Sequence, residues 1–122
     1  MPKKILIADD EPDVLSILEK KFKQDNFQVL ALSKGKDILD SVKSFKPDLM
    51  ILDIIMPDID GYSVAFLLRE DKELKGIPII FMTGKDLDHS GVQRRIAELG
   101  YCDFISKPCV FEDLLKKVNE IV

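Results

Sequence analysis

Short apolar segments alternate with longer amphipathic segments along the chain, and the alternation occurs five times. Three of the apolar segments contain hardly a polar residue, as strands buried on both faces do, and this pattern is typical of a parallel sheet covered by helices. The apolar segments are residues 5–8, 27–31, 49–52, 77–82 and 102–105. The sequence therefore predicts an α/β fold, a (βα)5 chain whose five parallel strands form a doubly wound sheet with right-handed crossovers.

The segments between the apolar runs carry apolar residues at helical spacing. In the first of them, Val14, Ile17, Leu18 and Phe22 are spaced to share one helix face, with Leu15 outside it. The same spacing occurs twice more, in the trio Val64, Leu67 and Leu68 and in the trio Leu114, Leu115 and Val118. We expect these faces to cover the sheet.

Length and composition narrow the class of protein. A chain of 122 residues fits one domain, so we expect a single domain over residues 1–122 with no output domain in this range. A net charge of −4 without a clustered basic run argues against direct nucleic-acid binding. No apolar stretch approaches the roughly 20 residues of a membrane span, and no secretory signal pattern is present, so we expect a cytoplasmic protein that does not bind membranes.

Polar residues follow the apolar segments at the places where such sheets carry their functional sites. In open parallel sheets, ligands bind outside the carboxyl ends of the strands. We therefore expect carboxylates, a hydroxyl and an ammonium group to converge at one edge of the sheet. The residues concerned are Asp9, Asp10 and Glu11 after the first segment, Asp53 at the end of the third, Thr83-Gly84 after the fourth and Ser106-Lys107-Pro108 after the fifth.

Each of these residues also has an ordinary structural explanation. An acidic cluster after a strand often caps the following helix, where it favours the positive end of the helix dipole. A Thr or a Lys at a strand end is commonly part of a turn or a solvated side chain. A functional site is indicated because all of these residues are expected at the same edge of the sheet.

The residue types favour a metal and a phosphoryl group. Asp9, Asp10 and Asp53 would raise one another's pKa unless a cation compensated their charges. Hard oxygen ligands suit Mg2+, with Mn2+ as the alternative, better than zinc. Lys107 as a point charge and Thr83 as a hydrogen-bond donor suit phosphoryl oxygens. Asp53, at the end of a buried strand, is the natural nucleophile.

These motifs resemble the response-regulator receiver family of two-component signalling, in particular its chemotaxis-type single-domain members. The resemblance covers essentially the whole chain and implies a flavodoxin-like sheet with strand order 2-1-3-4-5. It rests on Asp9-Asp10, Asp53 followed by Met56-Pro57 and Asp60-Gly61, Thr83-Gly84 and Lys107-Pro108.

The resemblance implies a role for each residue of the acidic group. Asp53 is expected to be the phosphoacceptor. Asp10 and Asp53 are expected to coordinate Mg2+ directly, together with the backbone carbonyl of Ile55, while Asp9 acts largely through water. Ile55 occupies a position that is variable in the family and is associated with the lifetime of the phosphoryl group.

The remaining motifs are expected to bind and report the phosphoryl group. The resemblance implies that Thr83 and Lys107 contact the phosphoryl oxygens, and that a cis Lys107–Pro108 bond directs the lysine into the site. Phe104 matches the position of the family's switch aromatic and would work with Thr83. A core phenylalanine explains Phe104 equally well.

The resemblance also implies the partners. A sensor His kinase or a His phosphotransfer protein is expected to supply the phosphoryl group, and a downstream protein target or an output domain absent from this chain is expected to read it. The domain would then be no enzyme beyond its own phosphorylation and dephosphorylation. Residues 111–122 lack the arginines that one group of DNA-binding members uses to dimerise, so we expect a monomer or weak dimer. Cys109 also departs from the family, which commonly has an aromatic residue after Lys-Pro.

Three other functions fit the sequence less well. A phosphatase with an aspartyl nucleophile usually needs a second carboxylate two residues later, where this chain has Ile55. A flavin-binding electron carrier needs a phosphate loop after the first strand, where Asp9, Asp10 and Glu11 would repel a phosphate. A degenerate receiver that serves only as a docking module is disfavoured by the intact set of motifs.

Overall fold

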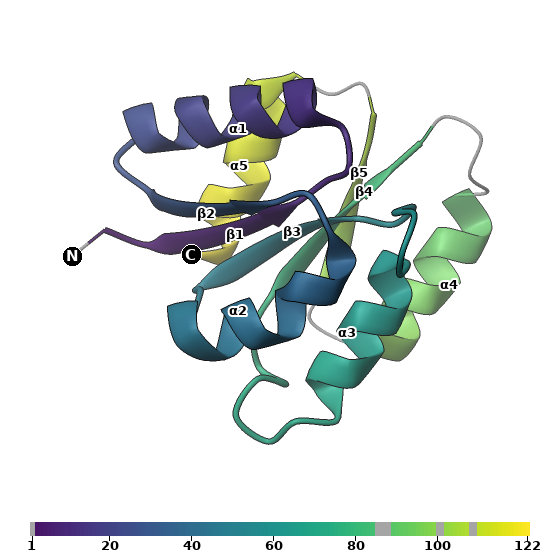
Figure 1. The fold of residues 1–122 in the computed structure, drawn as a ribbon. Helices are drawn as coiled ribbons and strands as arrows, with labels where there is room; N and C mark the ends of the chain where they lie inside the picture. Colours follow the sequence, from purple (N-terminus) through teal and green to yellow (C-terminus); the bar gives the residue numbers. More distant parts are fainter. Residues whose placement is uncertain (1, 85–88, 100–101, 108–109) are drawn as a thin grey trace.

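A parallel sheet of five strands in the order β2-β1-β3-β4-β5 forms the centre of the computed structural model (Figure 1). The structure describes residues 2–84, 89–99, 102–107 and 110–122. This arrangement confirms the predicted fold class and strand order. The strands are β1 (Lys4–Ala8), β2 (Gln28–Leu32), β3 (Leu49–Asp53), β4 (Ile79–Thr83) and β5 (Cys102–Ser106).

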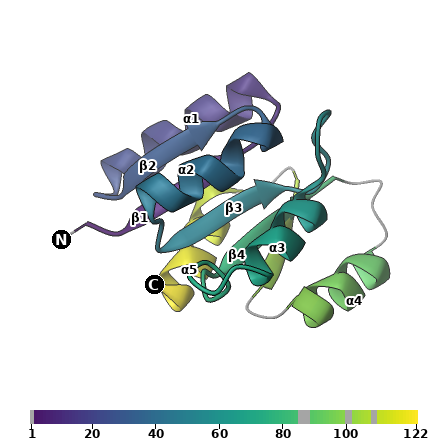
Figure 2. The same ribbon diagram turned by 60° about the horizontal axis from the view of Figure 1, so that its bottom comes forward.

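Helices cover both faces of the sheet. Helices α1 and α5 lie on one face, and α2, α3 and α4 lie on the other (Figure 1). Figure 2, turned so that the second face comes forward, shows α2 and α3 in front of the sheet and α4 beside α3. The bounds are α1 (Pro12–Gln24), a 3-10 turn η1 (Gly35–Asp37) that leads into α2 (Ile38–Phe45), α3 (Gly61–Arg69), α4 (His89–Leu99) and α5 (Phe111–Ile121).

None of the helices among the described residues is both long and apolar enough to cross a membrane.

The core consists of two layers, one on each side of the sheet. Because successive strand residues point to opposite faces, the apolar strands supply side chains to both layers. All five residues of β3 and all five of β4 are buried. On the α1–α5 side, Ile51 and Ile80 join Phe22 and Val118 in one layer; on the other side, Met50 and Phe81 belong to the second layer.

Two of the three predicted helix faces need correction. In α1, Leu18 and Phe22 are buried and Val14 and Leu15 pack against their core layer, whereas Ile17 is 56% exposed. At 3.6 residues per turn, positions 14, 15, 18 and 22 form one continuous stripe and position 17 falls about a third of a turn away from its middle.

The same error occurs in α3, and the prediction for α5 is confirmed. In α3, Val64 and Leu68 are buried with Ala65 between them, and Leu67 is exposed. In α5, Leu114 and Val118 are buried, with Leu115 packed against the same layer.

Local signals fix where the helices beside the sheet edge begin. Helix α1 begins at Pro12. The missing N–H of this proline removes no hydrogen bond, because the first amides of a helix have no partners within the helix. Asp60 caps α3 by accepting a hydrogen bond from the backbone N–H of Ser63 at 2.8 Å. Gly61 lies so close to β3 that a Cβ at this position would be 2.7 Å from the carbonyl oxygen of Asp53. A side chain at position 61 would therefore displace the end of β3.

Candidate functional site

The ends of β1 and β3 lie next to each other at the point where the strand order reverses. Ala8 pairs with Leu52, so Asp9 and Asp53 are the next residues along two neighbouring strands. β4 ends at Thr83, whose register partner on β5 is Ser106, and Lys107 follows directly. The structure thus brings the predicted acidic residues, Thr83 and Lys107 to one edge of the sheet.

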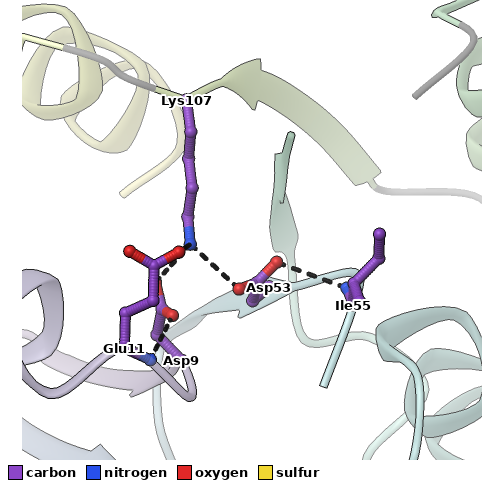
Figure 3. A network of polar contacts seen from close by, with 5 residues as sticks. All are labelled: Asp9, Glu11, Asp53, Ile55 and Lys107. Carbon is purple, nitrogen blue, oxygen red and sulfur yellow. Dashed lines mark hydrogen bonds and ion pairs between the residues drawn. The ribbon is translucent and has the colours of Figure 1, made fainter. Parts of the chain in front are cut away.

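The ammonium group of Lys107 lies among three carboxylates (Figure 3). Its Nζ atom is 2.8 Å from Asp9 Oδ2, 2.9 Å from Asp53 Oδ2 and 3.3 Å from Glu11 Oε1. The backbone N–H of Lys107 donates to the carbonyl of Thr83 at 2.6 Å, which fixes the point from which the side chain extends. Three acidic residues from two strand ends therefore share one cation.

Burial makes these charges interact strongly. Asp9 is fully buried and Asp53 is 6% exposed. Burial raises the pKa of Asp53 to about 6; the hydrogen bond from Lys107 opposes this shift, and the negative charge of Asp9 adds to it. Partial burial lowers the pKa of Lys107, but its close contacts with Asp9 and Asp53 outweigh this and raise the pKa above its ordinary value. Lys107 is therefore charged at neutral pH.

The acidic group offers a set of oxygen ligands to a metal ion. Carboxylate oxygens of Asp9, Asp10, Glu11 and Asp53 can all lie within 4.8 Å of one another. Asp10 and Glu11 are exposed, so the group opens to solvent on that side. Asp9 Oδ2 is buried without a hydrogen-bond donor of good geometry among the described residues, although Lys107 faces it as an ion-pair partner.

A hard divalent cation suits this site. The site holds four carboxylates and one ammonium group, so it has an excess of negative charge that a second cation would neutralise. All the side-chain donors are oxygens, and two of the carboxylates are open to water, which is the combination that Mg2+ prefers.

The other predicted residues take distinct places around Asp53. The N–H of Ile55 donates to Asp53 Oδ1 at 3.3 Å, on the side of Asp53 away from Lys107 (Figure 3). Ile55 is 60% exposed. Thr83 is fully buried, and its hydroxyl lies 3.5 Å from Ser106 Oγ. Phe104 is half-buried and packs against the core layer of α2 and α3.

Two expectations fall outside the described residues: the cis bond between Lys107 and Pro108, and the packing at Cys109.

The sequence pattern assigns Glu11 no role of its own beyond the acidic cluster. The structure places its carboxylate against Lys107, which is 96 positions away in the chain. Its position directly after Asp10 was the available signal, because a residue at the start of α1 stays close to the end of β1.

A family model described as the response regulator receiver domain matches residues 5–119. The chain belongs to this family. The receiver domain is 33% identical over 119 residues to protein PilH of Pseudomonas aeruginosa, and the match covers 98% of this chain and 97% of PilH. It is also 33% identical over 122 residues to the alkaline phosphatase synthesis transcriptional regulatory protein PhoP of Bacillus subtilis. That match covers all of this chain and 49% of PhoP, so the chain spans about half the length of this relative.

Solved structures show the same fold. The chemotaxis response regulator CheY4 of Vibrio cholerae superimposes with a TM-score of 0.90 over 100% of both chains at 20% sequence identity. At this identity the likeness concerns the fold alone. The two proteins therefore share one fold.

Proposed function

We propose that this receiver domain is a phosphorylation-dependent switch that accepts a phosphoryl group on Asp53 in the presence of Mg2+. The observation that carries the proposal is the position of the Asp53 carboxylate at the end of β3, 2.9 Å from Lys107 and within reach of the acidic group on β1. A sensor His kinase or a His phosphotransfer protein would be the donor.

The transfer would be a displacement at phosphorus. An oxygen of the Asp53 carboxylate forms the new bond to phosphorus, and the bond between phosphorus and the imidazole nitrogen of the donor histidine breaks. The electron pair of that bond stays on the imidazole, which takes up a proton from solvent. Asp53 enters the reaction ionised, and its pKa of about 6 leaves most molecules in that form at pH 7.

Lys107 has two tasks in this scheme. Before transfer, it compensates the charges of Asp9 and Asp53 and holds the Asp53 side chain in one orientation. After transfer, its ammonium group is within reach of a phosphoryl oxygen on Asp53 and stabilises the added negative charge. Glu11 competes for the same ammonium group, so Lys107 has to weaken that contact as it turns to the phosphoryl group.

Asp9, Asp10 and Asp53, with the backbone carbonyl of Ile55, are the residues that we propose hold Mg2+. The bound ion would neutralise charge on the phosphoryl oxygens during transfer. Asp9 is buried and ion-paired with Lys107, whereas Asp10 is exposed. Asp10 is thus free to turn toward the ion, and Asp9 is suited to act through water.

The phosphorylated state would be read at Thr83 and Phe104. Thr83 ends β4, and its register partner Ser106 lies two residues after Phe104 on β5. A phosphoryl group on Asp53 presents new acceptors to the Thr83 hydroxyl, whose contact with Ser106 is long at 3.5 Å and therefore weak. Movement of Thr83 would shift the population of Phe104 conformers and so alter the surface of α4 and β5.

A small phosphodonor tests the proposal without a kinase. With Mg2+ and acetyl phosphate, the wild-type domain should gain one phosphoryl group that is stable in acid and labile in base. Asp53→Asn should gain none, and EDTA should suppress labelling of the wild type. Asp48→Asn, at the opposite end of β3, is the matched control and should label normally. Equal labelling of Asp53→Asn and wild type would refute the proposal.

A further inference from the structure

The carboxylate of Asp58 joins the connection between β3 and α3 to the neighbouring connection between β2 and α2. Asp58 Oδ1 accepts a hydrogen bond from the N–H of Gly35 at 3.1 Å, and Oδ2 accepts one from the N–H of Lys36 at 2.9 Å. These amides lie at the start of η1, where backbone N–H groups lack partners inside the helix. Bonds of this kind to an ionised carboxylate are stronger than neutral ones, and here they lower the pKa of Asp58.

The two connections pack tightly at this point. Gly35 is buried, and a Cβ built on it would overlap the side chain of Ile59. Ile59 in turn packs against the core layer of α2 and α3. The position of Asp58 is therefore fixed by two hydrogen bonds and by close packing of the residue that follows it.

Ile55, by contrast, has weak contacts of its own. The residue is 60% exposed, and its N–H donates to Asp53 Oδ1 at 3.3 Å, which is long for such a bond. Its backbone must therefore be oriented by its neighbours along the chain. On one side, Ile54 is held by a hydrogen bond from its N–H to the carbonyl of Met82 at 3.1 Å.

Stiff residues connect Ile55 to Asp58 on the other side. Met56 is 6% exposed and belongs to the same core layer that Ile59 packs against, so a displacement of Asp58 and Ile59 would disturb the packing of Met56. Pro57 has a fixed φ and also restricts the backbone of Met56 to extended conformations. Few free torsions remain between Ile55 and Asp58, so a displacement of Asp58 would reorient the Ile55 carbonyl.

We propose that Asp58 is a positioning residue for the metal site: by binding the Gly35 and Lys36 amides, it orients the backbone carbonyl of Ile55 for Mg2+. This inference rests on the proposed function, because it takes the Ile55 carbonyl as a ligand. Asp58 itself would not touch the metal or the phosphoryl group.

The test measures Mg2+ binding directly, by calorimetric titration with MgCl2 and by the amide chemical shifts of the site. Asp58→Ala should weaken Mg2+ binding about three- to tenfold, at or just below the low end of losses seen when residues behind metal ligands are changed. Asp48→Ala is the matched control, since Asp48 is an exposed carboxylate that accepts the Lys4 N–H at 2.8 Å at the other end of β3. It should leave Mg2+ affinity unchanged, and urea titration should show that both variants are folded.

A second comparison separates the effect of the Asp58 hydrogen bonds from the effect of its negative charge. Asp58→Asn keeps an oxygen acceptor but removes the charge, and it should bind Mg2+ more tightly than Asp58→Ala. The loss in Asp58→Ala should persist in about 1 M salt, where charges interact over only about 3 Å.

Three results would overturn the inference: wild-type affinity in Asp58→Ala, the same loss in Asp48→Ala, or a loss that disappears in high salt with Asn no better than Ala. Wild-type protein that binds no Mg2+ would overturn the proposed function, and this inference with it.

Discussion

Replacing Asp53 by Asn should change how the stability of the domain depends on pH when divalent cations are absent. Burial raises the pKa of Asp53 from 3.8 to about 6. Between these values the folded protein binds a proton that the unfolded chain does not, so the free energy of unfolding falls as the pH rises. The stability from the neutral carboxyl group is complete below about pH 4 and is lost as the pH rises through 6.

The size of this effect follows from the shift. About two pKa units correspond to about 3 kcal/mol in total, of which about 2 kcal/mol falls between pH 4.5 and 7.5. Urea denaturation followed by circular dichroism in EDTA should show the wild type losing about this much stability relative to Asp53→Asn across the window. Asp40→Asn removes the same formal charge from an exposed position on α2 and serves as the control.

Mg2+ should restore the stability that the wild type loses at the upper end of the pH range. A cation that binds only the folded state at 100 times its Kd adds about 2.7 kcal/mol to the free energy of unfolding. The wild type should gain about this amount at pH 7.5, and Asp53→Asn should gain much less. If the difference in free energy of unfolding between wild type and Asp53→Asn stays constant from pH 4.5 to 7.5, the prediction is wrong, because burial then does not disfavour the ionised Asp53 carboxylate.

Two further predictions concern the response to phosphorylation. Thr83→Ala should still accept the phosphoryl group but should pass the conformational change on poorly. The phosphorylation-dependent amide shifts of residues 89–99 and 102–106 should therefore shrink, and unchanged shifts would exclude a conformational change that runs through Thr83. Ile55→Asn should accelerate loss of the label severalfold at fixed Mg2+, because an exposed apolar side chain beside Asp53 hinders the attacking water and cannot hold it. Each tenfold change corresponds to about 1.4 kcal/mol of barrier, and unchanged or slower decay would contradict this prediction.

The sequence was sufficient to predict the sheet and the edge at which the polar residues gather. Buried parallel strands leave a strong apolar pattern, and their carboxyl ends meet at one edge whatever the details of packing. Positions at the ends of the apolar segments therefore predict that four residues lie close together: Asp9, Asp53, Thr83 and Lys107. The structure confirms that they converge.

Features that depend on tertiary packing could not be predicted in this way. Positions 14, 17 and 18 are compatible with more than one helix face, and only contact with the sheet decides that Leu15 turns inward and Ile17 outward. The contact of Glu11 with Lys107 joins the two ends of the chain. Asp58 binds amides more than 20 positions upstream, and no local pattern marks such a pair.

Chemical mapping of the phosphorylated residue tests directly whether Asp53 is the phosphoacceptor. Borohydride reduces an aspartyl phosphate to homoserine, which keeps the position visible to peptide mass spectrometry. After reaction of the wild-type domain with acetyl phosphate and Mg2+, we expect homoserine at position 53 and at no other carboxylate of the acidic group, and none when EDTA replaces Mg2+. Homoserine at Asp9, Asp10 or Glu11, or a phosphorylated protein in which Asp53 remains unmodified, would contradict this expectation.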